Sequence, residues 1–232
     1  MIADFPTPSS ADIVALWVTL RLAALTTFLL LALGTPLAWW LARTRTRFRP
    51  VVDALVALPL VLPPTVLGFY CLLLLGPDGP GGQVARLFGG YSLAFTFTGL
   101  VIGSMVYSLP FMIQPLQQAF ISVSKESIEA AATLRAGPLD RFATVVLPQA
   151  APGFVTAASL TFAHTLGEFG VVLMIGGNIP GETQVLSIAI YDHVEALEYA
   201  NANFLSAGLL LMSFLLLLLV YRVRGPLPVR LP

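Results

Sequence analysis

The chain has 232 residues, of which 57% are hydrophobic and only 10% are charged. A soluble domain carries about a quarter charged residues, so this composition indicates a protein that is solvated by lipid. The formal net charge is +0, which argues against nucleic acid as a partner. The single cysteine, Cys71, excludes an intrachain disulfide, and the sequence contains neither a catalytic motif nor a metal-ligand spacing.

A short polar arm precedes the first apolar stretch. Ser9 or Ser10 is placed to cap a helix that begins just before Asp12, because a serine oxygen can accept a backbone N–H of the first turn. We expect three parts: an external arm over residues 1–10, a transmembrane domain over 11–222 and a cytoplasmic tail over 223–232.

Five apolar stretches are long enough to cross a bilayer, which takes roughly 20 helical residues. An amphipathic stretch over 184–200 leaves open a sixth helix that dips into the interface. We therefore predict an all-α integral membrane protein with about five, or six, transmembrane helices. The five expected spans are 22–41, 54–75, 92–119, 150–179 and 204–221.

The second predicted span is rich in proline, including Pro63 and Pro64. Proline removes a backbone donor and kinks a helix. In a helix bundle such a kink serves either as a static bend or as a joint between two alternating arrangements.

The fourth predicted span is interrupted only by Glu168. A carboxylate inside a membrane is a functional candidate by default. At about 1.5 Å of rise per residue, Glu168 falls near the outer end of this span. We expect it to have a structural or gating role and to pair with Arg21, or with His164 on the same helix face.

Basic residues indicate the orientation of the chain. All lysines and arginines except Arg21 and Arg86 follow the first, third or fifth span. The positive-inside rule then places the N-terminus outside and the C-terminus in the cytoplasm. The segment between the third and fourth spans is cytoplasmic on this basis.

That segment, residues 122–148, is polar and rich in alanine. Ser122 or Ser124 can start a helix with acidic residues in its first turn, where the helix dipole favours them. Gly137 and the proline after it break this helix. A second short helix over 139–146 is expected to stop at Pro148, so the segment forms a rigid helical hairpin that a soluble partner can grip.

The segment resembles the cytoplasmic signature of the permease subunits of ABC importers. The signature reads Glu-Ala-Ala, three residues, Gly, and later a hydrophobic residue, any residue, Leu and Pro. The matching residues of this chain are Glu129, Ala130, Ala131, Val145, Leu147 and Pro148. The Gly slot holds Arg135, and Gly137, two residues later, is expected to supply the bend instead.

The resemblance extends over nearly the whole chain and implies the fold of type I ABC importer permeases. Proline-rich and glycine-rich segments at 58–64, 165–170 and 177–183 make it similar to the molybdate permeases in particular. Sulfate, thiosulfate and tungstate permeases remain open, because their substrates are closely related oxyanions. Pore or gate candidates are Pro63, Pro64, Ser108, Thr161, Glu168, Asn178 and Thr183, the last two being alternatively contacts for a binding protein.

The resemblance also implies partners. The chain has no phosphate-binding Gly-x4-Gly-Lys loop, so it is not expected to be an enzyme or to bind a cofactor, and a separate ATPase subunit pair would use ATP-Mg. Further partners would be an extracytoplasmic oxyanion-binding protein, a second copy of the chain and lipid, in a bacterial plasma membrane. A passive channel and an intramembrane enzyme are the remote alternatives.

Overall fold

The computed structural model describes residues 8–224. Helix α1 runs from Ser10 to Arg43 and is about 50 Å long at the usual rise per residue. Ser9, one of the two serines predicted as the cap, starts the helix in a capping box. Ser9 Oγ accepts the N–H of Asp12, and the Asp12 carboxylate accepts the N–H of Ser9 at 2.8 Å. The residues expected to form the outer arm lie mostly outside the described part.

The second predicted span is two helices rather than one kinked helix. Helices α2 (Arg49–Val61) and α3 (Pro64–Leu75) meet at an angle of 114°. Leu62 and Pro63 between them have extended backbone, because a residue that precedes a proline avoids the helical region. Two consecutive prolines therefore end one helix and start the next. The short helix α4 (Pro80–Leu87), which the hydropathy pattern did not predict, follows α3.

The remaining spans are α5 (Phe97–Ser122), α8 (Leu147–Leu166) and α11 (Tyr199–Arg224). Among the described residues, four helical stretches are long and apolar enough to cross a membrane, and the bent α2–α3 pair is a fifth candidate. This agrees with the five predicted spans. Helix α11 continues two residues beyond the predicted domain boundary at 222, and the rest of the predicted tail lies outside the described residues.

The prediction of a fourth span over 150–179 was wrong at its outer end. Helix α8 stops at Leu166, where the N–H of Gly167 turns back to the carbonyl of His164. A separate helix, α9 (Gly170–Gly176), follows, and α10 (Leu186–Glu195) forms within the predicted amphipathic stretch. Glu168, the charged residue at this break, is buried and accepts hydrogen bonds from side chains of α5.

The prediction that Pro148 ends a short helix was also wrong. Helix α6 (Lys125–Thr133) is separate, but α7 (Pro138–Arg141) continues through a π-helical turn (Phe142–Val146) into α8. The N–H of Leu147 reaches the carbonyl of Phe142, five residues back. This wider turn carries the helix through Pro148, which has no N–H to donate.

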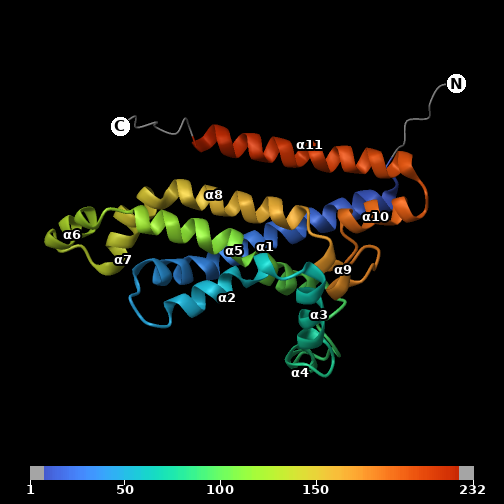
Figure 1. Cartoon of the computed structure of the whole chain (residues 1–232), viewed down its shortest axis with the longest axis horizontal. Coiled ribbons are helices and arrows are strands. Elements are labelled where there is room, and N and C mark those ends of the chain that lie inside the picture. Colours follow the sequence, from blue (N-terminus) through green and yellow to red (C-terminus); the bar gives the residue numbers. More distant parts are fainter. Residues whose placement is uncertain (1–7, 225–232) are drawn as a thin grey trace.

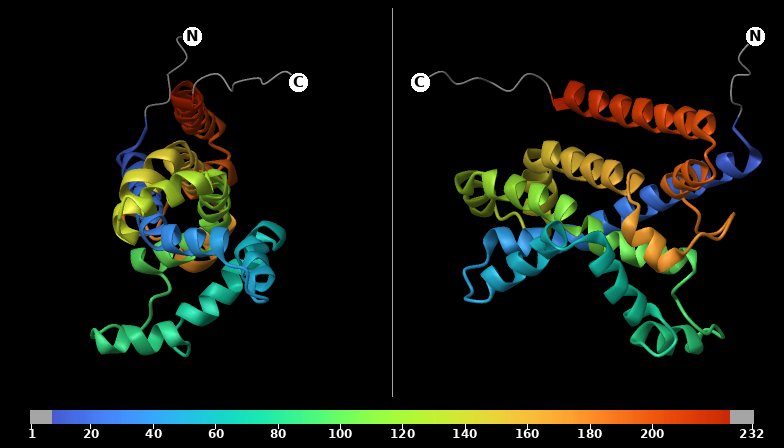
Figure 2. Two further views of the ribbon diagram at one scale, coloured as in Figure 1. Left: turned by 90° about the vertical axis from the view of Figure 1, so that its left-hand side faces the viewer. Right: turned by 45° about the vertical axis from the view of Figure 1, so that its right-hand side comes forward.

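Helices α1, α5 and α8 pack side by side as the centre of the molecule (Figure 1). Their shared core includes Leu30, Met112, Leu116, Phe120 and Ala157, each almost fully buried. Helix α11 lies on the outside, and α3 and α4 project away from the bundle (Figure 2). Helices α6 and α7 lie at one end of the bundle, and α9 and α10 lie at the other (Figure 1).

Candidate functional site

The coupling segment, residues 122–148, exposes apolar surface at one end of the bundle. Ser124 starts α6 by accepting the N–H of Ser127 at 3.2 Å. Leu134 is 83% exposed and Leu139 is 85% exposed. Glu129 and Ala130 are exposed on α6, and Ala131 is half-buried, so the predicted signature helix presents a small-residue surface. Neighbouring, highly exposed leucines such as Leu134 and Leu139 are typical of a surface that contacts another protein.

The bend after α6 is made by Arg135 and not by Gly137, contrary to the prediction. Arg135 has a left-handed backbone with φ of 63°, whereas φ of Gly137 is −69°. The N–H of Arg135 reaches the carbonyl of Ala132, and the N–H of Ala136 reaches that of Ala131. This is the hydrogen-bond pattern of a Schellman motif, whose left-handed position usually holds glycine. Residue 135, which the signature usually fills with glycine, is thus the residue of this turn whose backbone is left-handed and therefore strained for a side chain other than glycine.

Arg135→Gly is therefore expected to stabilise the coupling segment by about 1 kcal/mol, because glycine adopts a left-handed backbone without steric cost. Hydrogen exchange should report this as roughly fivefold greater protection of the α6 amides. Gly137→Ala is the matched control and should change protection little, since an added methyl group would have no neighbour within 4 Å. Lower protection in Arg135→Gly would contradict this assignment of the bend.

Aromatic side chains connect the coupling segment to the transmembrane helices. Trp39 of α1 meets Phe142 of the π-helical turn with ring centroids 5.4 Å apart, and Phe120 of α5 at 5.2 Å. A groove of about 510 Å³ lies beside them and is lined by residues that include Trp39, Phe142 and Leu139. Leu147 and Pro148, at the start of α8, are exposed. A displacement of α7 would therefore act directly on the packing of α1 and α5.

A second candidate site lies at the opposite end of α8, around the buried carboxylate of Glu168. Ser104 Oγ donates to Glu168 Oε2, and Ser108 Oγ donates to Glu168 Oε1 at 2.8 Å. His164 Nδ1 is 2.9 Å from Ser108 Oγ and 3.5 Å from Glu168 Oε1. The predicted proximity of His164 is thus confirmed, whereas Arg21 instead lies over the ring of Phe97. Hydropathy alone did not predict that Ser104 and Ser108 would form hydrogen bonds with Glu168.

An open hollow of about 670 Å³ adjoins this cluster. Its lining includes Pro64 and Thr65 of α3, Tyr107 of α5, and His164 and Glu168. The two helix breaks touch here, because a Cβ added to Gly170 would lie 2.9 Å from Cβ of Pro64. Predicted candidates Pro64 and Glu168 therefore lie together at the hollow, and Ser108 is buried directly behind it.

The other predicted pore candidates lie elsewhere. Thr161 is fully buried, and its hydroxyl has no hydrogen-bond partner within residues 8–224. Thr183 is also fully buried and donates to the carbonyl of Gly176 at 2.7 Å, so it shapes the loop after α9 from within. Asn178 is exposed and donates to Asp192. Pro63 is exposed at the bend before α3.

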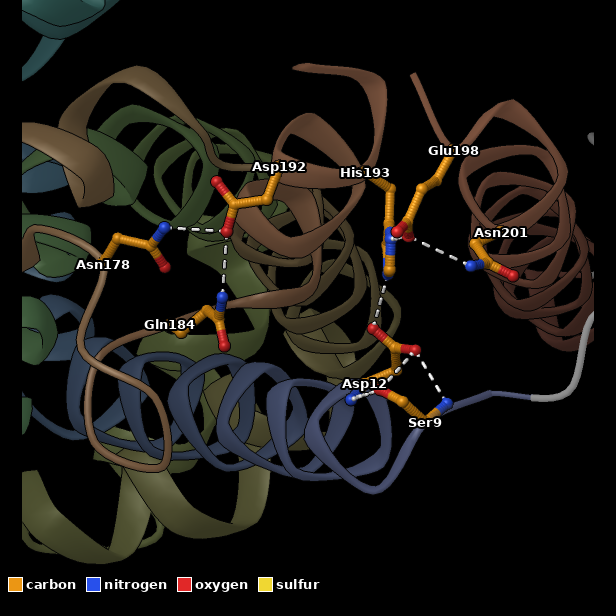
Figure 3. A network of polar contacts seen from close by, with 8 residues as sticks. All are labelled: Ser9, Asp12, Asn178, Gln184, Asp192, His193, Glu198 and Asn201. Carbon is orange, nitrogen blue, oxygen red and sulfur yellow. Dashed lines mark hydrogen bonds and ion pairs between the residues drawn. The ribbon is translucent and has the colours of Figure 1, made fainter. Parts of the chain in front are cut away.

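Two polar networks hold the end of the molecule that carries α10 (Figure 3). In one, Asn178 and Gln184 both donate to Asp192. In the other, His193 lies between two carboxylates, with Nε2 2.9 Å from Asp12 and Nδ1 2.8 Å from Glu198. Both ring nitrogens face acceptors, so the doubly protonated imidazolium satisfies the site and links α1 to the turn before α11.

The His193 link should make stability depend on pH. The hydrogen bond to Asp12 raises the pKa of His193 above its ordinary value of 6.5, and the hydrogen bond from His193 lowers the pKa of Glu198 below its ordinary 4.5. Because the folded state holds the His193 proton more tightly, this stabilisation is fully present below about pH 6.5 and is lost as pH rises through the raised pKa. The Glu198 contribution is lost only at acidic pH, as pH falls through its lowered pKa.

We therefore expect a higher thermal midpoint at pH 6 than at pH 8.5. The measurement is a melting curve of the purified protein in detergent at both values. His193→Gln should reduce the difference, since glutamine does not titrate. An equal difference in that variant would show that other groups cause it.

Comparison with known proteins identifies the class to which this arrangement of spans and coupling segment belongs. Residues 34–227 match the family described as the binding-protein-dependent transport system inner membrane component. The chain belongs to this family of membrane transport components.

Among curated proteins, the chain is 59% identical to the molybdenum transport system permease protein ModB of Azotobacter vinelandii, over 93% of this chain and 96% of that one. It is 34% identical to ModB of Escherichia coli strain K12, over 78% of this chain and 79% of the other. The sulfate transport system permease protein CysT of Salmonella typhimurium is 35% identical, over 79% of this chain and 66% of that protein.

Solved structures share the fold. A bacterial ABC transporter involved in the import of the acidic polysaccharide alginate matches with a TM-score of 0.75 and 17% identity, over 94% of this chain and 80% of that one. The MetNI methionine ABC transporter, in inward-facing conformations, matches with a TM-score of 0.70 and 21% identity, over 91% and 94%. The chain therefore has the fold of type I ABC importer permeases, and its relatives are permeases.

Proposed function

We propose that the chain is the permease subunit of an ATP-driven importer that moves molybdate into the cytoplasm. The observation that carries this proposal is the 59% identity to a molybdenum permease along nearly the full length of both chains. Sulfate is the alternative substrate, because a sulfate permease is 35% identical over most of this chain. Tungstate is a second alternative, as another tetrahedral dianion.

The proposed complex contains two copies of the chain, a pair of ATPase subunits that use ATP-Mg, and an extracytoplasmic binding protein. The exposed Leu134 and Leu139 support the ATPase contact, because apolar side chains at such a surface gain most when a partner covers them. One structural relative is described as an alginate transporter in complex with a periplasmic protein, which supports the binding protein as a partner.

The proposed orientation places the coupling segment in the cytoplasm and the loop around Asn178 outside. The distribution of lysine and arginine supports it, since the basic residues at the end of α1, between α5 and α8 and in the last turn of α11 lie at one end of the bundle (Figure 1). Under this proposal the hollow beside Glu168 lies toward the external end of α8, where an anion would arrive from the binding protein.

The mechanism is alternating access driven by the ATPase pair. ATP binding brings the two ATPase subunits together and moves both coupling segments. The contact between Phe142 and Trp39 then passes the movement to α1 and α5. The ATPase pair can shift the equilibrium between the two pore states only if its closed form binds one of them more tightly. The size of the shift is set by that difference in binding free energy.

Uptake of radiolabelled molybdate into proteoliposomes that contain the full complex tests the substrate. We expect ATP-dependent uptake that excess tungstate reduces and that an equal excess of sulfate reduces far less. ATP-dependent uptake of sulfate with no uptake of molybdate would assign the chain to the alternative.

A further inference from the structure

Three hydrogen-bond donors from three different spans line the hollow beside Glu168. They are Thr65 of α3, Tyr107 of α5 and His164 of α8. Within residues 8–224, Thr65 Oγ1, the Tyr107 hydroxyl and His164 Nε2 make no hydrogen bond. These groups are therefore available to a ligand, and hydroxyls and an imidazole N–H are groups that an oxyanion accepts from.

The hydrogen bonds around Ser108 determine which ring nitrogen of His164 carries a proton. A serine hydroxyl has one proton, and Ser108 gives it to Glu168. Ser108 Oγ must then accept from His164 Nδ1, so Nδ1 carries a proton. The ring also stacks on Phe111, with centroids 4.0 Å apart. His164 is thus fixed in place with Nε2 as its uncommitted nitrogen. Because Nδ1 already carries a proton, Nε2 donates only when the ring is doubly protonated, and this is the form that an anion site requires.

The charge of the hollow suits transient binding. Its described lining contains neither lysine nor arginine, so no fixed cation would trap an anion there. Glu168 would repel an anion, but both of its oxygens accept hydrogen bonds from serines of α5, and an imidazolium at His164 would balance its charge. A site of this kind can replace part of the water shell of an anion and still release it.

We propose that this hollow is an oxyanion-binding site on the translocation path, in which Thr65, Tyr107 and the doubly protonated ring of His164 donate to the substrate. This inference rests on the proposed function and deepens it by naming where the oxyanion is held within the permease. Ser108, buried behind the hollow, and Glu168, at its wall, act as positioning residues for His164.

Variants that remove each donor at nearly constant shape test the site. They are Thr65→Val, Tyr107→Phe and His164→Phe, made singly and together in the full complex. Tyr70→Phe is the matched control, because Tyr70 is 58% exposed on α3 and does not line the hollow. Proteoliposome assays measure molybdate transported and ATP hydrolysed by the same preparation.

Each single variant should lower the molybdate transported per ATP by about tenfold to a hundredfold, as expected for one hydrogen bond to a charged ligand. The triple variant should lose more than any single one, while ATP hydrolysis stimulated by the loaded binding protein persists. Tyr70→Phe should match the unmodified complex. A merely structural role would reduce transport and hydrolysis in parallel and lower the thermal midpoint, and that result would overturn the proposal.

The substrate question is separable from this result. If the unmodified complex carries sulfate and not molybdate, the proposed substrate fails, and the same variants are then assayed with sulfate. Full transport per ATP in the triple variant, with whichever oxyanion the unmodified complex carries, would overturn the site and leave the importer assignment intact.

Discussion

Replacing Leu134 and Leu139 together by glutamate is expected to abolish ATP-driven uptake while the permease still inserts and folds. Both side chains are more than four-fifths exposed, so the change removes almost no internal packing. If the ATPase covers them, two buried leucines are replaced by two buried charges, and the affinity should fall by at least about a hundredfold. Copurification of the ATPase with the tagged permease measures this directly.

The control for that variant is a second pair of exposed leucines away from the coupling segment. Leu87 is 82% exposed at the end of α4, and Leu197 is 71% exposed before α11. Their replacement by glutamate should leave ATPase copurification unchanged. If the Leu134 and Leu139 variant retained the ATPase as fully as this control, the coupling segment would not be the contact surface.

Glu168→Ala should have the second largest effect, on the stability of the transmembrane bundle. It removes the acceptor of two serine hydroxyls that are fully buried. Ser108 keeps its contacts with His164 and Thr165, but Ser104 Oγ loses its one hydrogen-bond partner within residues 8–224. Together with the space left behind, this should cost about 2–4 kcal/mol. The thermal midpoint of the purified complex should fall by roughly 10 °C.

Two further variants sharpen this prediction. Glu182→Ala removes an exposed carboxylate in the neighbouring loop and should leave the midpoint unchanged. Glu168→Gln keeps the shape of the side chain and one hydrogen-bond acceptor. Its thermal midpoint should therefore lie between those of the two alanine variants. A midpoint for Glu168→Ala within a degree or two of that of Glu182→Ala would mean that the cluster does not hold α5 to the α8–α9 break.

Local patterns in the sequence predicted much of the fold. Long apolar stretches predicted the spans, because burial in lipid depends on composition over about 20 residues. The serine before Asp12 predicted the start of α1, and the four-residue spacing of His164 and Glu168 predicted their proximity. Each of these relations lies within one helix or one turn, where the spacing along the chain fixes the spacing in space.

The features that the sequence did not predict depend on geometry between distant segments. Hydropathy could not distinguish a kink from the 114° bend at Pro63, because both have the same composition. The break at Gly167 was missed because apolar residues continue on both sides of it. The His193 link joins Asp12 to the other end of the chain, and no local pattern reports such a pair.

The assignment of Arg135 shows a different limit. A glycine nearby was the natural candidate for the bend, yet the hydrogen bonds of α6 place the left-handed residue at Arg135. The register of the signature was the informative signal, since the slot that usually holds glycine is this position. Counting from Glu129 placed Arg135 in that slot, but the prediction moved the bend to Gly137 because of its residue type.

In the proposed orientation the coupling segment faces the cytoplasm and receives the ATPase, while the loop after α9 faces outside. Single cysteines test it most directly, in a background where Cys71, the only cysteine, is replaced by serine. Both Ala132 and Asn178 are exposed, so Ala132→Cys and Asn178→Cys are suitable probes for a maleimide that does not cross membranes.

Intact cells should label Asn178→Cys and not Ala132→Cys. Inverted vesicles should label Ala132→Cys, and added ATPase should protect it. Labelling of Ala132→Cys from outside intact cells would place the coupling segment on the external side. Equal labelling with and without the ATPase would show that the ATPase does not cover it.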